Sequence, residues 1–215
     1  MPPKVPDAYR EQQRREILRV ALRVFAARGL ARASMQDVVD ATGKSRGWVY
    51  LYFTNKEDLA RALFEDLSKD LDGELAALLV RPGSTWEALE AFIDVVATSL
   101  AGPEVEDEHA FVIEFAAAAR AAEGAQLLAF GRYQAVLRRL TERIEVGAAR
   151  GDLTPQASPG AIASAVIAFL DGLSQHRYFL GASRIETGPP IAAFKIALRA
   201  MLGCEPPRTE KGCSP

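Results

Sequence analysis

A stretch of fourteen residues near the N-terminus carries the side chains with the clearest chemistry in this chain. Residues 43–56 read GKSRGWVYLYFTNK. Gly43 can adopt a positive φ and Ser45 can cap a helix, so the stretch predicts a tight turn followed by a helix of about two turns. This helix carries cationic and aromatic side chains and needs little core. Such a surface suits contacts with the phosphates, sugars and base edges of a nucleic acid.

This helix needs neighbouring elements that hold it at the surface. A short helix is expected upstream over residues 34–42, because Ser34 and Asp37 have the spacing of a capping box. Together the two short helices predict a helix-turn-helix, whose second helix can enter the major groove of DNA. A longer helix over about 9–28, ended by Gly29, should precede them and supply an apolar stripe.

The rest of the chain also has a helical pattern, and no run of alternating residues predicts a strand. After a loose arm over residues 1–8 and the three N-terminal helices, a long helix begins at residue 54 or 55. In this helix leucines recur every fourth position. Further helices are expected over about 85–101, from the acidic run 104–108 to about 122, and over 125–150, 159–180 and 191–202. The predicted fold is all-α with about nine helices: a helix-turn-helix domain over 1–55, a helical body over 56–202 and a disordered tail over 203–215.

The charge is divided unevenly along the chain. Residues 1–60 contain eleven Lys and Arg against seven Asp and Glu, whereas the remainder contains fifteen against twenty-one. A basic N-terminal part on an acidic body is typical of a DNA-reading domain on a carrier that does not itself contact nucleic acid. Many enzymes show a similar drift, so this feature supports the DNA interpretation without deciding it.

Several classes of protein are disfavoured by composition. No apolar run approaches the ~18 residues that a membrane span requires, and no secretory signal is recognisable, so a cytoplasmic protein is expected. The two cysteines, Cys204 and Cys213, lack metal-ligand spacing and are interpreted as reduced, incidental thiols. No metal or cofactor is expected.

Residues 14–63 combine several features at characteristic spacing, and this combination resembles the tetracycline-repressor (TetR) family of transcriptional regulators. The features are the apolar stripe through Phe25, Gly29, the Gly43-x-Ser45-x-Gly47 turn, Tyr50, Phe53, Lys56, Glu57 and Leu59. The resemblance implies a homodimer that binds palindromic double-stranded DNA, usually as a repressor, and that responds to a small molecule held in the helical body. Nothing in the residues separates a repressor from an activator.

The resemblance and the residue chemistry together give each DNA-contacting candidate a role. Arg46 is predicted to bind guanine through two hydrogen bonds. Lys56 and Tyr50 are predicted to contact phosphates, although an ordinary surface lysine and a half-buried core tyrosine are the alternatives. The hydroxyl of Ser34 either contacts a phosphate or serves as a helix cap alone. The full predicted set is Ser34, Met35, Lys44, Ser45, Arg46, Gly47, Trp48, Tyr50, Leu51, Tyr52 and Lys56.

Three residues depart from the pattern of the family. Lys44 occupies a turn position that is usually apolar, Trp48 replaces a small residue, and Val39 stands where alanine is common. The first two are expected to change which DNA sequence is read. Trp48 either packs against DNA or belongs to the core of its own domain.

The last two helices have broad apolar surfaces, and the resemblance implies that they form the dimer interface as a four-helix bundle. The alternative is a core within one subunit. Aromatic residues in the body either line the implied ligand cavity or form ordinary core, and the two histidines, His109 and His176, are more often structural than functional. The aromatic residues concerned are Trp86, Phe92, Phe111, Phe115, Phe130 and Tyr133.

Two other function classes compete with the regulator. An enzyme is disfavoured, because the chain lacks a phosphate-binding glycine loop, a nucleophile elbow and a zinc-type Cys/His cluster. A helical protein–protein interaction module would instead use Trp48 and Tyr52 as anchors. Salt-sensitive binding of DNA would separate the regulator from this module.

Overall fold

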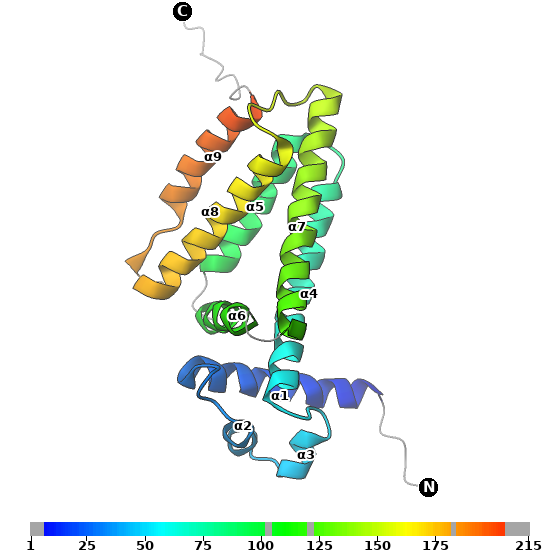
Figure 1. Cartoon of the computed structure of the whole chain (residues 1–215), viewed down its shortest axis with the longest axis vertical. Coiled ribbons are helices and arrows are strands. Elements are labelled where there is room, and N and C mark those ends of the chain that lie inside the picture. Colours follow the sequence, from blue (N-terminus) through cyan, green and yellow to red (C-terminus); the bar gives the residue numbers. More distant parts are fainter. Residues whose placement is uncertain (1–6, 102–104, 120–122, 182–183, 205–215) are drawn as a thin grey trace, which may run out of the picture. The chain divides into compact units, whose positions relative to one another are not determined.

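The computed structural model describes residues 7–101, 105–119, 123–181 and 184–204, and within these ranges it contains helices and no strand. The predicted all-α class is therefore confirmed. None of the helices in these ranges combines the length and apolarity needed to cross a membrane. Figure 1 shows the helices of the described part, which are α1 (Asp7–Arg28), α2 (Met35–Thr42), α3 (Arg46–Tyr50), α4 (Lys56–Val80), α5 (Thr85–Ala101), α6 (Val105–Ala119), α7 (Glu123–Arg150), α8 (Pro159–Leu180) and α9 (Gly188–Leu202).

Most predicted helix ends agree with the structure to within a few residues. Gly29 and Gly43 follow α1 and α2 with φ of 79° and 64°, so each stands where a residue with a side chain would be strained. Helix α1 begins at Asp7, and residues 1–6 of the predicted arm lie outside the described residues. Helix α9 begins three residues earlier than expected, because Pro189 and Pro190 fit the first turn of a helix.

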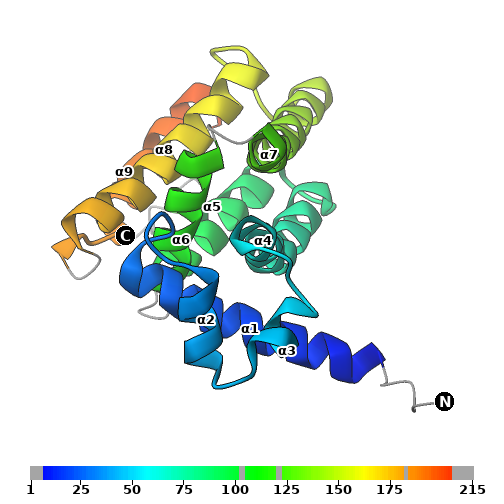
Figure 2. The ribbon, with the colours of Figure 1, turned by 60° about the horizontal axis from the view of Figure 1, so that its bottom comes forward.

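The chain divides into two compact units, and the first comprises residues 1–72 and 103–130. Its core joins the apolar stripe of α1 to α2, α3, the first half of α4 and α6, and Figure 2 shows α6 beside α1. Rings from different helices stack in this core. Phe25 and Phe111 lie 5.7 Å apart between centroids, and Phe64 and Phe115 lie 4.6 Å apart. The short helices α2 and α3 are thus held on a well-packed support.

The second unit comprises residues 73–102 and 131–215, and in its described part α5, α8 and α9 pack against one another. Phe169 of α8 and Phe194 of α9 stack face to face, with centroids 4.0 Å apart. The buried Arg143 of α7 donates to the carbonyl oxygens of Gly83 and Ser84, over 3.0 and 3.1 Å, and so fixes the turn before α5.

These units differ from the predicted division into residues 1–55 and 56–202. Helix α6 belongs to the first unit because Phe111 and Phe115 are buried in the core that it shares with α1, α2 and α3. The predicted disordered tail also begins too early. The N–H of Gly203 donates to Ala200 and that of Cys204 donates to Arg199, so both residues are fixed to the end of α9. Residues 205–215, including Cys213, lie outside the described residues.

The Cys204 thiol has the environment of an unreactive cysteine. Burial raises its pKa, with Arg199 acting in the opposite direction to a smaller extent. A raised pKa reduces the fraction of reactive thiolate at neutral pH, in line with the incidental role expected from the sequence.

Candidate nucleic-acid interface

The start of α2 is held by reciprocal hydrogen bonds between Ser34 and Asp37. The Asp37 N–H donates to Ser34 Oγ over 3.2 Å, and the Ser34 N–H donates to Asp37 Oδ2 over 2.8 Å. The side-chain and backbone bonds from Ser34, with a smaller effect of the Arg28 guanidinium, lower the pKa of the Asp37 carboxyl. The predicted capping box is therefore confirmed. Ser34 remains exposed, and the side chain of Met35 is half-buried against the core.

The turn between α2 and α3 is shaped by short-range hydrogen bonds. The Thr42 hydroxyl donates to the Val39 carbonyl over 2.7 Å and accepts from the N–H of Lys44 over 3.2 Å. Ser45 Oγ then accepts from the N–H of Trp48 over 3.3 Å, so Ser45 caps α3 as predicted. The turn thereby sets the direction in which α3 leaves it.

Helix α3 is shorter than the two turns expected, since its regular part covers only five residues. The chain continues through a turn in which the N–H of Phe53 donates to the carbonyl of Val49 over 3.2 Å. Val49 and Phe53 are both buried in the core of the first unit. Their burial draws the chain inward and ends the helix, which leaves the intervening residues at the surface.

The exposed side of this segment contains most of the predicted DNA contacts. Four consecutive residues from Lys44 to Gly47 are exposed, and Leu51 is 76% exposed. A Cβ at Gly47 would meet no atom within 4 Å, so this position faces open space. Among the described residues, neither Lys44 nor Arg46 has a carboxylate partner. The exposed side of this segment is therefore accessible and positively charged, and its two cations have no carboxylate partner among the described residues.

Aromatic rings hold the two cationic side chains of this segment. Lys44 Nζ lies 5.4 Å from the ring centroid of Trp48, and the Arg46 guanidinium carbon lies 5.2 Å from that of Tyr50. The rings of Trp48 and Tyr52 lie 5.3 Å apart. All three aromatic residues are half-buried against the core, so Trp48 belongs partly to its own domain. Each cation–π contact is worth about 0.5–1 kcal/mol at an exposed site and limits the motion of its cation.

Lys56 lies at the start of α4 in a different setting. Its ammonium donates to the carbonyl oxygens of Leu30, Ala31 and Ala33, over 3.0, 3.2 and 2.9 Å. An ammonium has three donors, so all of them have partners in the turn after α1. A phosphate contact by Lys56 would have to replace one of these bonds.

Glu114 on α6 was not among the predicted residues, although it touches the same turn. Its Oε2 accepts from the N–H of Leu30 over 2.5 Å. A single carboxylate within the apolar run of residues 110–119 is a signal that a specific partner exists, because burying an unpaired charge is costly. The sequence contains no sign that this partner lies 84 positions away.

The aromatic residues proposed for a ligand cavity have varied surroundings. Phe111 and Phe115 are core residues of the first unit, and Phe92 is buried in the second. Trp86 lies under the Arg199 guanidinium, 4.1 Å from its ring centroid. Phe130 and Tyr133 are exposed.

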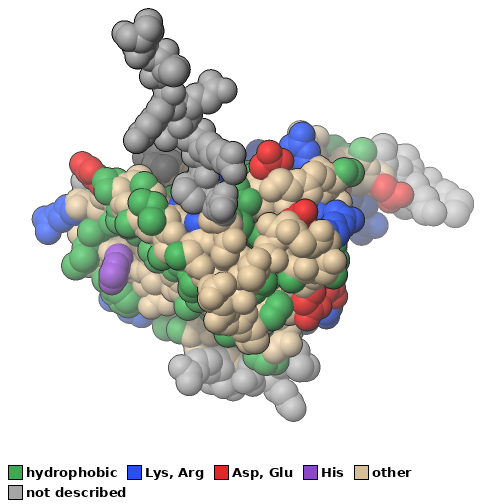
Figure 3. Space-filling view, turned by 90° about the horizontal axis from the view of Figure 1, so that it is seen from above, with side chains coloured by type: hydrophobic (Ala, Val, Ile, Leu, Met, Phe, Trp, Pro, Cys, Tyr) green, Lys and Arg blue, Asp and Glu red, His purple; other side chains and the backbone are tan. Residues whose placement is uncertain are grey.

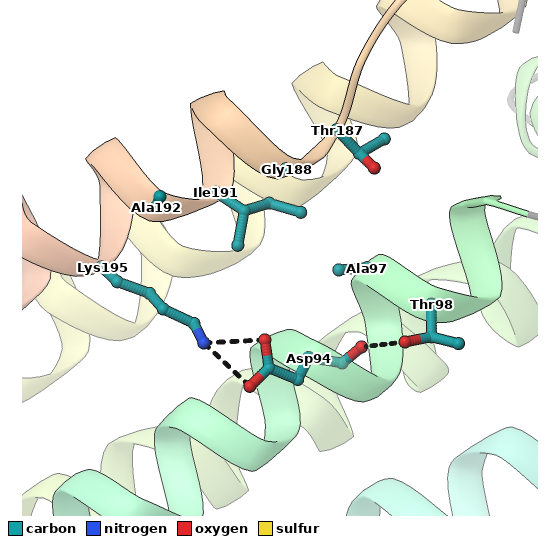
Figure 4. Close-up of a pocket in the computed structure, with 8 residues that line it drawn as sticks. All are labelled: Asp94, Ala97, Thr98, Thr187, Gly188, Ile191, Ala192 and Lys195. Atoms are coloured by element: carbon teal, nitrogen blue, oxygen red, sulfur yellow. Dashed lines mark hydrogen bonds and ion pairs between the residues drawn. The ribbon is translucent and has the colours of Figure 1, made fainter. Parts of the chain in front are cut away.

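A groove of about 380 Å³ lies between α5 and α9 in the second unit, and none of these six aromatic residues lines it. Figure 4 shows its lining, which is mostly small side chains, with the Lys195 ammonium bound to Asp94. The Lys195 ammonium also lies 3.4 Å from Glu90 Oε1, so this cation is shared by two carboxylates and is not free to bind an anionic ligand.

Comparison with known proteins identifies relatives for both parts of the chain. The family described as bacterial regulatory proteins of the tetR family matches residues 17–63, which include the turn and α3. The family described as the tetracyclin repressor-like C-terminal domain matches residues 88–187.

Individual relatives agree with these matches. The uncharacterized HTH-type transcriptional regulator YfiR of Bacillus subtilis is 27% identical over 205 residues, which cover 94% of this chain and 98% of the relative. The HTH-type transcriptional repressor KstR2 of Rhodococcus jostii is 30% identical over 93 residues, 43% of this chain and 46% of the relative. The solved structure of the fatty acid degradation regulator FadR from Bacillus halodurans has the same fold, with a TM-score of 0.75 and 17% sequence identity. The match covers 94% of this chain and 100% of the FadR chain.

Proposed function

Because the chain belongs to the tetracycline-repressor family of DNA-binding transcriptional regulators, we propose that it represses transcription as a homodimer bound to a palindromic operator. We further propose that a small molecule held by the helical body releases it. The observation that carries the DNA contact is the exposed side of the segment from Lys44 to Leu51, which presents cations without a carboxylate partner among the described residues on a rigid support. Such a regulator works in the cytoplasm, where bacterial DNA lies.

Within this proposal each exposed residue has a distinct task. Arg46 reads a guanine, because a guanidinium can donate to both O6 and N7. Gly47 allows close approach of the backbone, and Leu51 contacts thymine methyl groups together with Trp48 and Tyr52. Phosphate contacts position the protein without reading sequence. They come from Lys44, Ser45, the Tyr50 hydroxyl, Ser34 with Met35 at the start of α2, and Lys56 if a phosphate replaces one carbonyl.

The homodimer is supported by the outer surface of the last two helices. Scattered exposed apolar side chains are common on proteins, and Figure 3 shows such green side chains on one face of this one. Helix α9 is different, because every residue of its exposed stripe is apolar. Ile196 at its centre is 73% exposed. The stripe comprises Pro189, Ala192, Ala193, Ile196, Ala197 and Ala200.

Helix α8 exposes Ala161, Ala168 and Phe179, and between them it also exposes the polar residues Asp171 and Gln175. Its opposite side is already buried in the core of the second unit. The apolar stripe of α9 beside the partly apolar surface of α8 suits a two-fold symmetric four-helix interface. A core within one subunit would not leave the α9 stripe exposed.

DNA selection tests the function directly. We expect the full-length protein to select a palindrome from a random DNA pool, with half-sites about one helical turn apart. Fluorescence anisotropy on the selected DNA should show binding that weakens steeply with salt, by about 0.9 in logarithmic slope for each phosphate contacted. Absence of selection, combined with salt-insensitive capture of a protein partner through Trp48 and Tyr52, would instead support the interaction module.

A further inference from the structure

The turn that joins α1 to α2 is held from two sides by charged side chains of other helices. The Lys56 ammonium of α4 binds its carbonyl groups, and the Glu114 carboxylate of α6 binds its Leu30 N–H. Both peptide groups that flank the Leu30 Cα are therefore hydrogen-bonded to a charge, one to a cation and one to an anion. Hydrogen bonds to charged groups are about twice as strong as neutral ones.

Neither charge lies where a helix dipole would favour it. Lys56 is in the first turn of α4, where a cation is disfavoured. The Glu114 carboxylate lies beside the carboxyl end of α1, since a Cβ on Gly29 would be 3.6 Å from Glu114 Oε2. The hydrogen bonds to the turn must therefore offset the unfavourable interaction of each charge with a helix dipole. This indicates that both charges serve to hold the turn in place.

The backbone of α6 near Glu114 is anchored independently of this bond. Phe111 stacks on Phe25 of α1, and Phe115 stacks on Phe64 of α4. Both rings are buried. Glu114 thus projects from a helix whose backbone is held in place, so its carboxylate is presented within reach of the turn.

We infer that Glu114 is a positioning residue for DNA binding: it fixes the turn after α1 and thereby the placement of the first residues of α2. Ser34, the N-cap of α2, follows directly after the clamped Ala33. This inference rests on the proposed DNA interface, but it gives Glu114 no contact with DNA. A displaced turn would shift α2, and with it the turn that directs α3 into the groove.

Three variants of the full chain separate positioning from charge. Glu114→Gln keeps an oxygen that can accept from Leu30, whereas Glu114→Ala removes it. Asp107→Ala removes a negative charge from an exposed position of the same helix and serves as the matched control. On the selected operator, Glu114→Ala should raise Kd about fivefold to tenfold, and the Gln and Asp107 variants should stay within about twofold of wild type.

The salt dependence of operator binding distinguishes a positioning role from a phosphate contact, because only the loss of a phosphate contact changes its slope. Because Glu114 neutralises no phosphate, the logarithmic slope of affinity against salt should be the same for Glu114→Ala and wild type. Amide hydrogen exchange measures the turn itself. The Leu30 N–H should exchange faster in Glu114→Ala than in wild type or Glu114→Gln. If the alanine variant does not fold, Glu114→Asp takes its place and should behave in the same way, because its shorter side chain draws the carboxylate back from the turn.

The outcomes distinguish this inference from the proposed function. Unchanged exchange at Leu30, or equal weakening by Glu114→Ala and Asp107→Ala, would overturn the positioning role even if the wild type binds its operator tightly. Failure of the wild type to bind any DNA would overturn the proposed function. In that case faster exchange in Glu114→Ala would still show that Glu114 holds the turn.

Discussion

At the scale of single residues, Arg46 combines exposure with restraint. Its guanidinium lies over the Tyr50 ring on the accessible side of α3, and no carboxylate among the described residues competes for it. A preordered guanidinium loses less conformational entropy when it binds than a freely moving one. These properties make Arg46 the strongest candidate for reading a base.

Replacing Arg46 with alanine should therefore change specificity more than general affinity. We expect Arg46→Ala to cost about 1–3 kcal/mol on the matched operator and much less on an operator in which the contacted guanine is replaced. Anisotropy titrations on both DNA sequences measure this difference. Equal losses on the two operators would mean that Arg46 contacts only the backbone of the DNA.

Gly147 shows how one buried position can limit substitution. A Cβ at this residue of α7 would lie 2.8 Å from Leu153 Cδ1 and 2.9 Å from Thr85 Cβ, which real contacts do not permit. Gly147→Ala should therefore lower the free energy of unfolding by about 1–3 kcal/mol through overpacking. Gly131→Ala is the control on the same helix. No atom lies within 4 Å there, and the better helix propensity of alanine should stabilise the protein by up to about 1 kcal/mol.

At the scale of elements, α2 depends on its cap more than on its length. Eight residues are too few for a stable isolated helix, so the bonds between Ser34 and Asp37 and the packing of Val38 and Val39 must hold it. The carboxylate of Asp37 accepts hydrogen bonds from the N–H of Ser34, from the hydroxyl of Ser34 and from the Arg28 guanidinium. The ionised form accepts these bonds more strongly than the protonated form does.

The contribution of Asp37 to stability should therefore depend on pH. Its folded-state pKa is lowered, so the stabilisation is complete above the unfolded-state pKa and is lost as the pH falls through the folded-state value. Denaturant unfolding at a series of pH values should show that Asp37→Asn is less stable than wild type at pH 7. The difference should shrink below about pH 4. A difference that stays constant on acidification would exclude the ionised cap as its source.

At the scale of the whole molecule, the proposed function requires two copies of the chain. One α3 helix contacts too few base pairs to select a site, and the exposed apolar stripe of α9 supplies a surface for pairing. Sequence-specific DNA binding and self-association are therefore expected to fail together when this stripe is disrupted.

An aspartate at the centre of the stripe tests this coupling. Ile196→Asp should convert the dimer to a monomer, because it would bury a charge in an apolar interface. It should also weaken operator binding at least about tenfold, since each monomer then contacts only one half-site. Sedimentation velocity and anisotropy measure the two effects. Val80→Asp is the matched control, because Val80 is similarly exposed, at 76%, but lies outside the stripe. It should leave the dimer intact.

The sequence by itself determined the helical class, most helix ends and the exposed segment that we propose as the DNA contact. Local physics sufficed for these features: φ at Gly29 and Gly43, the capping box at Ser34 and the spacing of apolar residues all act within a few positions. The resemblance of residues 14–63 then gave the local pattern a function, and the matching families agree with it.

Only the tertiary structure decided which distant groups meet. It assigned α6 to the same core as α1, bound Lys56 to the turn around Leu30, and brought Glu114 to the other side of that turn. It also ended α3 early, because Val49 and Phe53 are buried in the shared core. These features depend on packing between segments far apart in the chain, and neither periodicity nor residue type specifies the partner of a lone charge or ring.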